Sequence, residues 1–138
     1  MTRDHRKLRV FQQADALVID IYKATKGFPP EERYGLQAQI RRAAVSTASN
    51  IVEGCARRSQ RDYLNFCNIS LGSACEVRYQ LDLSGRLGYL CGAGAKAFDA
   101  RCHILIRGLV RLIESLENEP SVEQVTPEPL KSEVKSEV

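Results

Sequence analysis

The apolar residues near the start of the chain recur every three or four positions, a spacing that places them on one face of an α-helix. In residues 5–26 this face consists of Phe11, Ala14, Val18 and Ile21, and Leu17 and Tyr22 widen it. Gly27 and the Pro29-Pro30 pair follow directly. Because the residue before a proline disfavours helical geometry and glycine favours a helix end, they predict the end of the first helix and a tight reversal.

A second helix is expected over residues 30–54. Pro30, Glu31 and Glu32 suit its first turn, because proline presets the backbone angle and carboxylates favour the positive end of the helix dipole. The predicted packed face consists of Ile40, Ala44, Thr47 and Ile51. Residues 43–49 are almost all small, so a neighbouring helix can approach closely along them.

The third and fourth helices have equally regular apolar faces. Ser59, followed three residues later by Asp62, predicts a capped start for a third helix that extends to about Leu87. Its face consists of Tyr63, Phe66, Ser70, Ala74, Val77 and Leu81. After several glycines, the face of the fourth helix consists of Phe98, Cys102, Leu105, Leu109, Leu112 and Leu116. Four helices with short connections predict an all-α, antiparallel up-down-up-down four-helix bundle over residues 1–118.

Composition changes after the fourth helix. Residues 119–138 are rich in Pro, Glu, Ser, Val and Lys and contain no aromatic residue, so we expect a disordered acidic tail. Residues 1–118 hold 18 basic and 12 acidic residues, whereas residues 119–138 hold 2 and 5. The predicted bundle therefore has a net charge of +6, larger than the +3 of the whole chain.

Several functional classes are disfavoured by what the sequence contains. The five cysteines include no C-x-x-C pair, so the sequence indicates neither a disulfide framework nor a zinc site, and we interpret the cysteines as buried, reduced side chains. We expect no metal and no cofactor. No stretch approaches the ~20 apolar residues of a membrane span, and the N-terminus is charged, so we expect a cytoplasmic protein without a membrane partner. No constellation of nucleophile, base and metal ligands indicates an enzyme.

Arg41 and Arg42 are the most informative charged residues. Positions three and four residues away on either side offer no acidic partner on the same helix. One interpretation is phosphate contact, because a guanidinium group grips phosphate oxygens bidentately. The other is an ion pair with a carboxylate on another helix or across a subunit interface. Adjacent helical residues diverge by ~100°, so both roles can coexist.

A second basic cluster is expected between the second and third helices. Arg57, Arg58 and Arg61 lie beside the N–H groups of a helix start and predict a compact anion site. The alternative is a solvated loop in which Glu53 pairs with Arg57 and Asp62 with Arg58. Further basic residues lie in a predicted mobile N-terminal end and on an outer face of the fourth helix: Arg3, Arg6, Lys7, Arg9, Arg107 and Arg111.

The aromatic residues do not predict a platform for stacking nucleobases. Tyr63 and Phe66 fall on a core face, and Tyr34 falls at a helix start. We therefore expect any nucleic-acid binding to be mostly electrostatic, strongly salt-dependent and weakly sequence-specific.

Four blocks of sequence carry a resemblance to a known family. They are residues 28–36 (FPPEERYGL), 39–46 (QIRRAAVS), 50–54 (NIVEG) and 71–76 (LGSACE). In this order they resemble the four-helix-bundle proteins encoded in intervening sequences of bacterial 23S ribosomal RNA genes, over roughly residues 8–116. The resemblance implies a homo-oligomer, with members that look like pentameric barrels, and no enzymatic activity. A related branch serves as the accessory protein of diversity-generating retroelements and is thought to bind nucleic acid and a reverse transcriptase.

These observations predict a non-enzymatic protein that binds nucleic acid, with RNA or an RNA–protein complex favoured over DNA. We expect it to form a ring-like homo-oligomer, which the resemblance implies is a pentamer. The candidate contacts are Arg41, Arg42, Arg57, Arg58 and Arg61. The alternative function is an oligomeric scaffold that binds a protein partner such as a reverse transcriptase.

Overall fold

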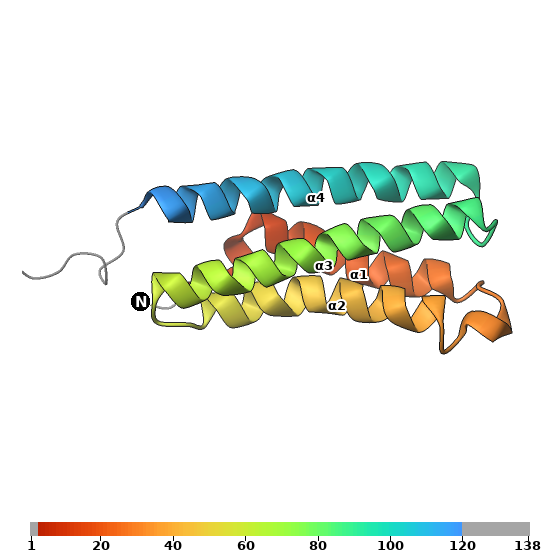
Figure 1. Cartoon of the computed structure of the whole chain (residues 1–138), viewed down its shortest axis with the longest axis horizontal. Helices are drawn as coiled ribbons and strands as arrows, with labels where there is room; N and C mark the ends of the chain where they lie inside the picture. The colour runs from red at the N-terminus through yellow and green to blue at the C-terminus, as the bar shows by residue number, and fades with distance from the viewer. Residues whose placement is uncertain (1–2, 120–138) are drawn as a thin grey trace, which may run out of the picture.

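The computed structural model describes residues 3–119, and the helices in this part of the chain lie side by side (Figure 1). It contains four α-helices, two short 3-10 segments and no strand within these residues. The elements are η1 (His5–Lys7), α1 (Arg9–Thr25), η2 (Pro30–Glu32), α2 (Leu36–Cys55), α3 (Gln60–Arg86) and α4 (Gly92–Asn118). The predicted all-α class is confirmed for this region. Except for Glu119, the predicted tail lies outside the described residues.

The turns that connect the helices lie at the two ends of the molecule. The α2–α3 turn lies near the N-terminus of the chain, and the α3–α4 turn lies at the opposite end (Figure 1). None of the helices in residues 3–119 combines the length and the apolar character that crossing a membrane requires.

The predicted core faces of α2, α3 and α4 are largely confirmed. Ile40, Ala44, Thr47 and Ile51 are all buried, as expected for α2. On α1, the buried face is rotated from the prediction and consists of Val10, Ala14, Leu17, Ile21 and Thr25. Phe11 and Val18 are only partly buried. Apolar residues occupy both sets of positions, so periodicity alone could not select the face that meets the other helices.

Small side chains and the buried hydroxyl group of Ser70 hold α2 against α3, and a second buried hydroxyl, that of Thr47, bonds within α2. The Ser70 hydroxyl donates a 2.7 Å hydrogen bond to the backbone carbonyl of Thr47, and the Thr47 hydroxyl donates one of 2.9 Å to the carbonyl of Ala43. Closer to the turn, a Cβ atom added to Gly54 would lie 3.0 Å from the Cβ of Phe66. The predicted close approach at the small-residue segment is therefore present.

The α1–α2 connection differs from the prediction. Pro30, Glu31 and Glu32 form a separate 3-10 turn, and α2 begins only at Leu36. The backbone of Gly35, at φ −100° and ψ −115°, breaks the helical path between the two elements. A Glu32 carboxylate oxygen accepts a long hydrogen bond of 3.5 Å from the backbone N–H of Leu36. Glu32 therefore caps α2 from outside the helix.

The predicted start of α3 is confirmed, whereas the prediction of five buried cysteines is wrong. The Ser59 hydroxyl accepts a 3.0 Å hydrogen bond from the N–H of Asp62. Cys55, Cys67 and Cys102 are buried, but Cys75 and Cys91 are exposed. Cys91 precedes α4, where its sulfur accepts a 3.3 Å hydrogen bond from the N–H of Gly94. A cysteine can thus cap a helix as well as fill the core.

We predict that the buried thiols make the protein less stable at alkaline pH. Burial raises the pKa of Cys102 to about 11 and that of Cys67 to about 12. In the unfolded chain a thiol titrates near 8.5, so above that pH the unfolded state loses protons that the folded state keeps. The free energy of unfolding should fall from about pH 8.5 toward the folded pKa values, by up to ~1.4 kcal/mol per pH unit for each thiol.

Urea denaturation at pH 8 and pH 10 measures this dependence. The Cys102→Ala variant is the control, and it should show a smaller loss of unfolding free energy between the two pH values than the parent. An equal loss in both proteins would contradict the assignment to this thiol.

Candidate nucleic-acid interface

Arg41 bridges α2 and the last turn of α1. Its Nε donates a 2.9 Å hydrogen bond to the hydroxyl of Thr25, and its Nη2 donates one of 3.1 Å to the carbonyl of Tyr22. The guanidinium carbon also lies 4.6 Å from the centre of the Tyr22 ring. A cation at the carboxyl end of a helix is favourable because it satisfies carbonyls that lack helical partners. The structural partner of Arg41 is thus a hydroxyl and a carbonyl rather than the carboxylate considered from sequence.

Arg42 takes no part in these contacts and is exposed. It lines two shallow hollows, one of about 350 Å³ between α2 and α3 and one of about 400 Å³ near the start of α2. Within residues 3–119 it forms no ion pair. Adjacent arginines therefore have different environments, and only Arg42 keeps its guanidinium group available to an external anion.

The arginines of the α2–α3 turn are exposed and lack carboxylate partners in the described part of the chain. Neither the Glu53–Arg57 pair nor the Arg58–Asp62 pair is present there. The guanidinium group of Arg57 instead lies over the ring of Phe66, 4.8 Å from its centre. Two of the three turn arginines share an open hollow of about 710 Å³, which is lined by Arg58, Ser59, Arg61, Asp62, Leu64, Asn65 and Asn68.

Arg3 holds the N-terminal segment against this turn. Its Nη1 donates a 3.1 Å hydrogen bond to the carbonyl of Arg57, and its guanidinium carbon lies 4.2 Å from the centre of the Tyr63 ring. Arg6 forms a 3.0 Å ion pair with Asp4. These contacts place Arg3 beside Tyr63, a proximity that the sequence could not show.

Other arginines are neutralised by carboxylates on their own or neighbouring helices. The N–O distances are 2.8 Å for Arg78–Asp99, 2.9 Å for Arg86–Asp82 and 2.9 Å for Arg101–Asp20. The hydrogen bond from Arg78 lowers the pKa of Asp99. Arg78–Asp99 joins α3 to α4, Arg101–Asp20 joins α4 to α1, and Arg86–Asp82 lies within α3. These paired arginines contrast with the unpaired arginines of α2 and the α2–α3 turn.

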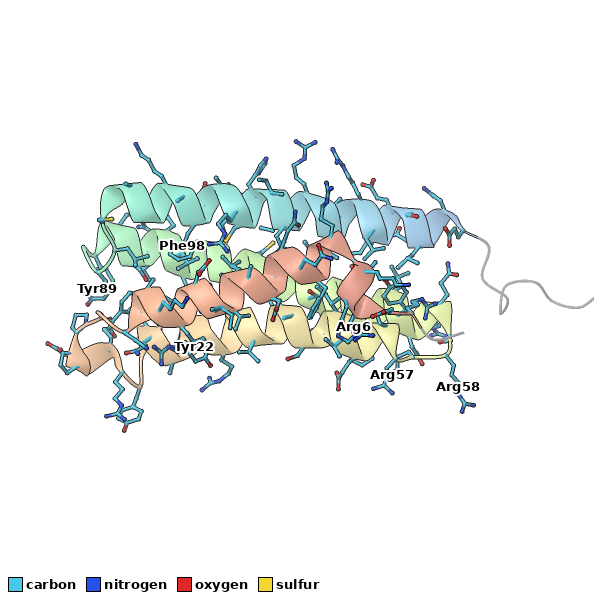
Figure 2. All side chains as sticks on the ribbon, turned by 180° about the vertical axis from the view of Figure 1, so that it is seen from behind. Arg6, Tyr22, Arg57, Arg58, Tyr89 and Phe98 are labelled. Atoms are coloured by element: carbon cyan, nitrogen blue, oxygen red, sulfur yellow. The ribbon has the colours of Figure 1, made fainter. Side chains whose placement is uncertain are left out.

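The five arginines proposed from sequence do not form one site. Figure 2 shows Arg57 and Arg58 near one end of the bundle and Tyr22, the contact of Arg41, toward the other. Fifteen residues of mostly helical chain separate Arg42 from Arg57, which corresponds to roughly 20 Å along the helix axis. A single chain therefore presents two separate basic patches. The first patch, called the α2-start patch below, contains Arg33, Arg41 and Arg42, and the second, the α2–α3 turn patch, contains Arg57, Arg58 and Arg61.

A third basic surface lies between α1 and α4. It surrounds a hollow of about 390 Å³ that is lined by Leu8, Arg9, Val10, Gln13, His103, Ile104, Arg107, Gly108, Arg111 and Leu112. Ile104 is 55% exposed, so part of this surface is apolar. A Cβ atom added to Gly108 would lie 2.9 Å from the Cγ1 of Val10, which shows that the two helices meet closely here.

Sequence reasoning missed three residues beside Arg41 and Arg42. Tyr22, Arg33 and Tyr34 line the same hollow of about 400 Å³. Tyr34 is 85% exposed. A signal for this exposure was available, because Tyr34 lies two positions before Leu36 and so falls outside the three-four repeat of buried residues that begins there.

We predict that Arg41 stabilises the fold and that Arg42 does not. Replacing Arg41 with Ala removes two hydrogen bonds to α1 and should lower the free energy of unfolding by about 1–2 kcal/mol. The matched Arg42→Ala variant should stay within about 0.5 kcal/mol of the parent, because that side chain is exposed and unpaired in residues 3–119. Urea denaturation measures both values, and equal losses would contradict the division of roles.

Comparison with known proteins identifies the family. The family model described as "23S rRNA-intervening sequence protein" matches residues 6–111. A crystal structure from Bacteroides thetaiotaomicron, described as a protein of unknown function from the S23 ribosomal protein family, has the same fold, with 24% identity and a TM-score of 0.69. That similarity covers 76% of this chain and 98% of the other. A search of curated proteins finds no match. Because the family model spans most of the sequence, the chain belongs to the 23S rRNA-intervening sequence protein family.

Proposed function

We propose that this chain is a non-enzymatic nucleic-acid-binding protein, with RNA or an RNA–protein complex as its preferred ligand. The observation that carries the proposal is a group of exposed arginines without a carboxylate partner in residues 3–119, which includes Arg42, Arg57, Arg58 and Arg61. Guanidinium groups that are not neutralised within the protein are suited to phosphate oxygens. The net charge of +6 over residues 1–118 favours the same class of ligand.

We further propose that the protomer is an up-down-up-down bundle and that five copies assemble into a ring. Two patches separated by roughly 20 Å give one chain few simultaneous phosphate contacts. In a pentamer each patch would occur five times, and linked weak contacts would bind with greater overall strength. Apolar side chains on the outer faces of the helices support assembly, since Ile19 is 52% exposed and Ile69 44% exposed.

We predict that RNA binding weakens steeply as salt concentration rises and depends on the α2–α3 turn patch. The Arg58→Ala/Arg61→Ala variant removes two unpaired guanidinium groups. It should weaken binding and reduce the slope of log affinity against log salt by up to about 2, since each lost phosphate contact lowers it by about 1. Fluorescence anisotropy with labelled RNA and DNA across a salt series measures the slope, and light scattering in the same buffers measures the oligomer mass.

The control variant for this experiment is Arg86→Ala/Lys96→Ala, which removes the same charge from exposed positions on α3 and α4. It should bind RNA with nearly the parental salt slope. Equal slopes in the two variants would contradict the assignment to the turn. A change in oligomer mass caused by Arg58→Ala/Arg61→Ala would make these residues interface residues instead.

A second candidate function is a scaffold for a protein partner such as a reverse transcriptase. The hollow between α1 and α4 favours it, because apolar side chains there are flanked by Arg9, Arg107 and Arg111 without any carboxylate among the lining residues. This chemistry suits a partner segment that carries both apolar and acidic side chains. A stable oligomer that binds neither RNA nor DNA at low salt would overturn nucleic-acid binding and favour the scaffold.

A further inference from the structure

The hollow beside the start of α2 combines aromatic and cationic side chains. It is lined by Tyr22, Arg33, Tyr34, Gln37, Ala38, Arg41 and Arg42, with a volume of about 400 Å³. No carboxylate is among these residues. The volume falls within the ~300–1,000 Å³ typical of small-molecule sites, so it is large enough for one nucleotide. The lining thus offers flat apolar faces together with positive charge.

Tyr34 is the residue whose placement the fold does not explain. Its side chain is 85% exposed, the largest exposure among the large apolar and aromatic side chains in residues 3–119. The Arg33 guanidinium carbon lies 5.4 Å from the centre of its ring. Solvent exposure of an aromatic ring is unfavourable, and a ligand with a flat face would cover it.

The segment that carries Tyr34 is held in place by contacts on either side. Phe28, immediately before the two prolines, is buried, and its ring centre lies 5.4 Å from that of Tyr89. After Tyr34, the carboxylate of Glu32 accepts a hydrogen bond from the N–H of Leu36. These contacts hold the backbone on both sides of Tyr34, which reduces the backbone entropy lost on binding.

We propose that this hollow binds an unpaired nucleobase of single-stranded nucleic acid, with Tyr34 stacking on the base and Arg42 contacting a neighbouring phosphate. The inference rests on the proposed nucleic-acid function and specifies its ligand. Stacking on tyrosine is available to every base, whereas bases inside a duplex are already stacked and paired. Arg41 donates hydrogen bonds to Thr25 and Tyr22 and lies over the Tyr22 ring, so it positions that side of the hollow. Arg42 is then the residue that contacts phosphate.

The test compares single-stranded and duplex RNA of the same sequence, 15 nucleotides long, in binding to Tyr34 variants. Tyr34→Ala removes the ring and should weaken single-strand binding by about 5- to 150-fold, the range measured for loss of one base–aromatic stack. Duplex binding should stay near the parental value. Tyr34→Phe keeps the ring and should restore single-strand binding.

Tyr79→Ala is the matched control, because Tyr79 is also an exposed tyrosine, at 59%, and lies on α3 away from the lining of the hollow. It should bind both RNAs like the parent protein. Thermal unfolding of each variant should match the parent, since both side chains are exposed.

The outcomes distinguish base stacking on Tyr34 from the broader proposal that the protein binds nucleic acid. If Tyr34→Ala binds single strands like the parent, or weakens single-strand and duplex binding equally, base stacking is overturned. The broader function would still stand if Arg58→Ala/Arg61→Ala weakens binding in the same assay. If the parent protein binds neither RNA at low salt, the proposed function itself is overturned.

Discussion

The structure depends on the close contact between α2 and α3. Ala43 and Ala44 give α2 a small buried surface, and the buried hydroxyl of Ser70 donates its hydrogen bond to the backbone of Thr47. Burying a hydroxyl without a partner is costly, so this bond requires the two helices to keep their register. Because this face of α2 is buried, the longer polar side chains of the helix must lie on its other faces. The direction of Arg41 and Arg42 is a consequence of this packing.

The two arginines illustrate how one helix can serve both fold and function. Arg41 reaches α1 and donates hydrogen bonds to Thr25 and Tyr22, so it links α2 to the last turn of the first helix. Arg42, ~100° further around the helix, is exposed. Arg78 of α3 likewise has a partner within the protein, the carboxylate of Asp99, whereas the arginines of the α2–α3 turn have no carboxylate partner in the described residues. Unneutralised guanidinium groups lie at the start of α2, at the α2–α3 turn and between α1 and α4, and we place the phosphate contacts at the first two.

Local signals in the sequence predicted most of the fold. The three-four repeats identified the packed face of α2, and Ser59 with Asp62 located the start of α3. Contacts between distant segments could not be predicted. Arg3 lies over Tyr63, sixty residues away in sequence. The separate 3-10 turn at Pro30–Glu32, after which α2 begins only at Leu36, was also not predicted. The rotation of the buried face of α1 was also hidden, because apolar residues occupy both candidate faces.

The sequence identified the arginines of the candidate site but not how they are arranged in space. The five arginines were identified from the absence of acidic neighbours on the same helix or from their clustering at a turn. Their separation into two patches follows from the length of α2, and the commitment of Arg41 to α1 follows from packing. From sequence, Tyr34 was set aside as a stacking residue because it falls at a predicted helix start, whereas its exposure is a property of the connection between helices. Sequence patterns describe helices better than the segments between them.

Photochemical cross-linking of the full-length protein to RNA, followed by mass spectrometry of the cross-linked peptides, tests the central claim most directly. We expect cross-links in peptides that contain residues 33–42 and residues 57–61, which carry the α2-start patch and the α2–α3 turn patch. Cross-links confined to peptides of α1 and α4, or none above the level of an unrelated protein, would contradict it.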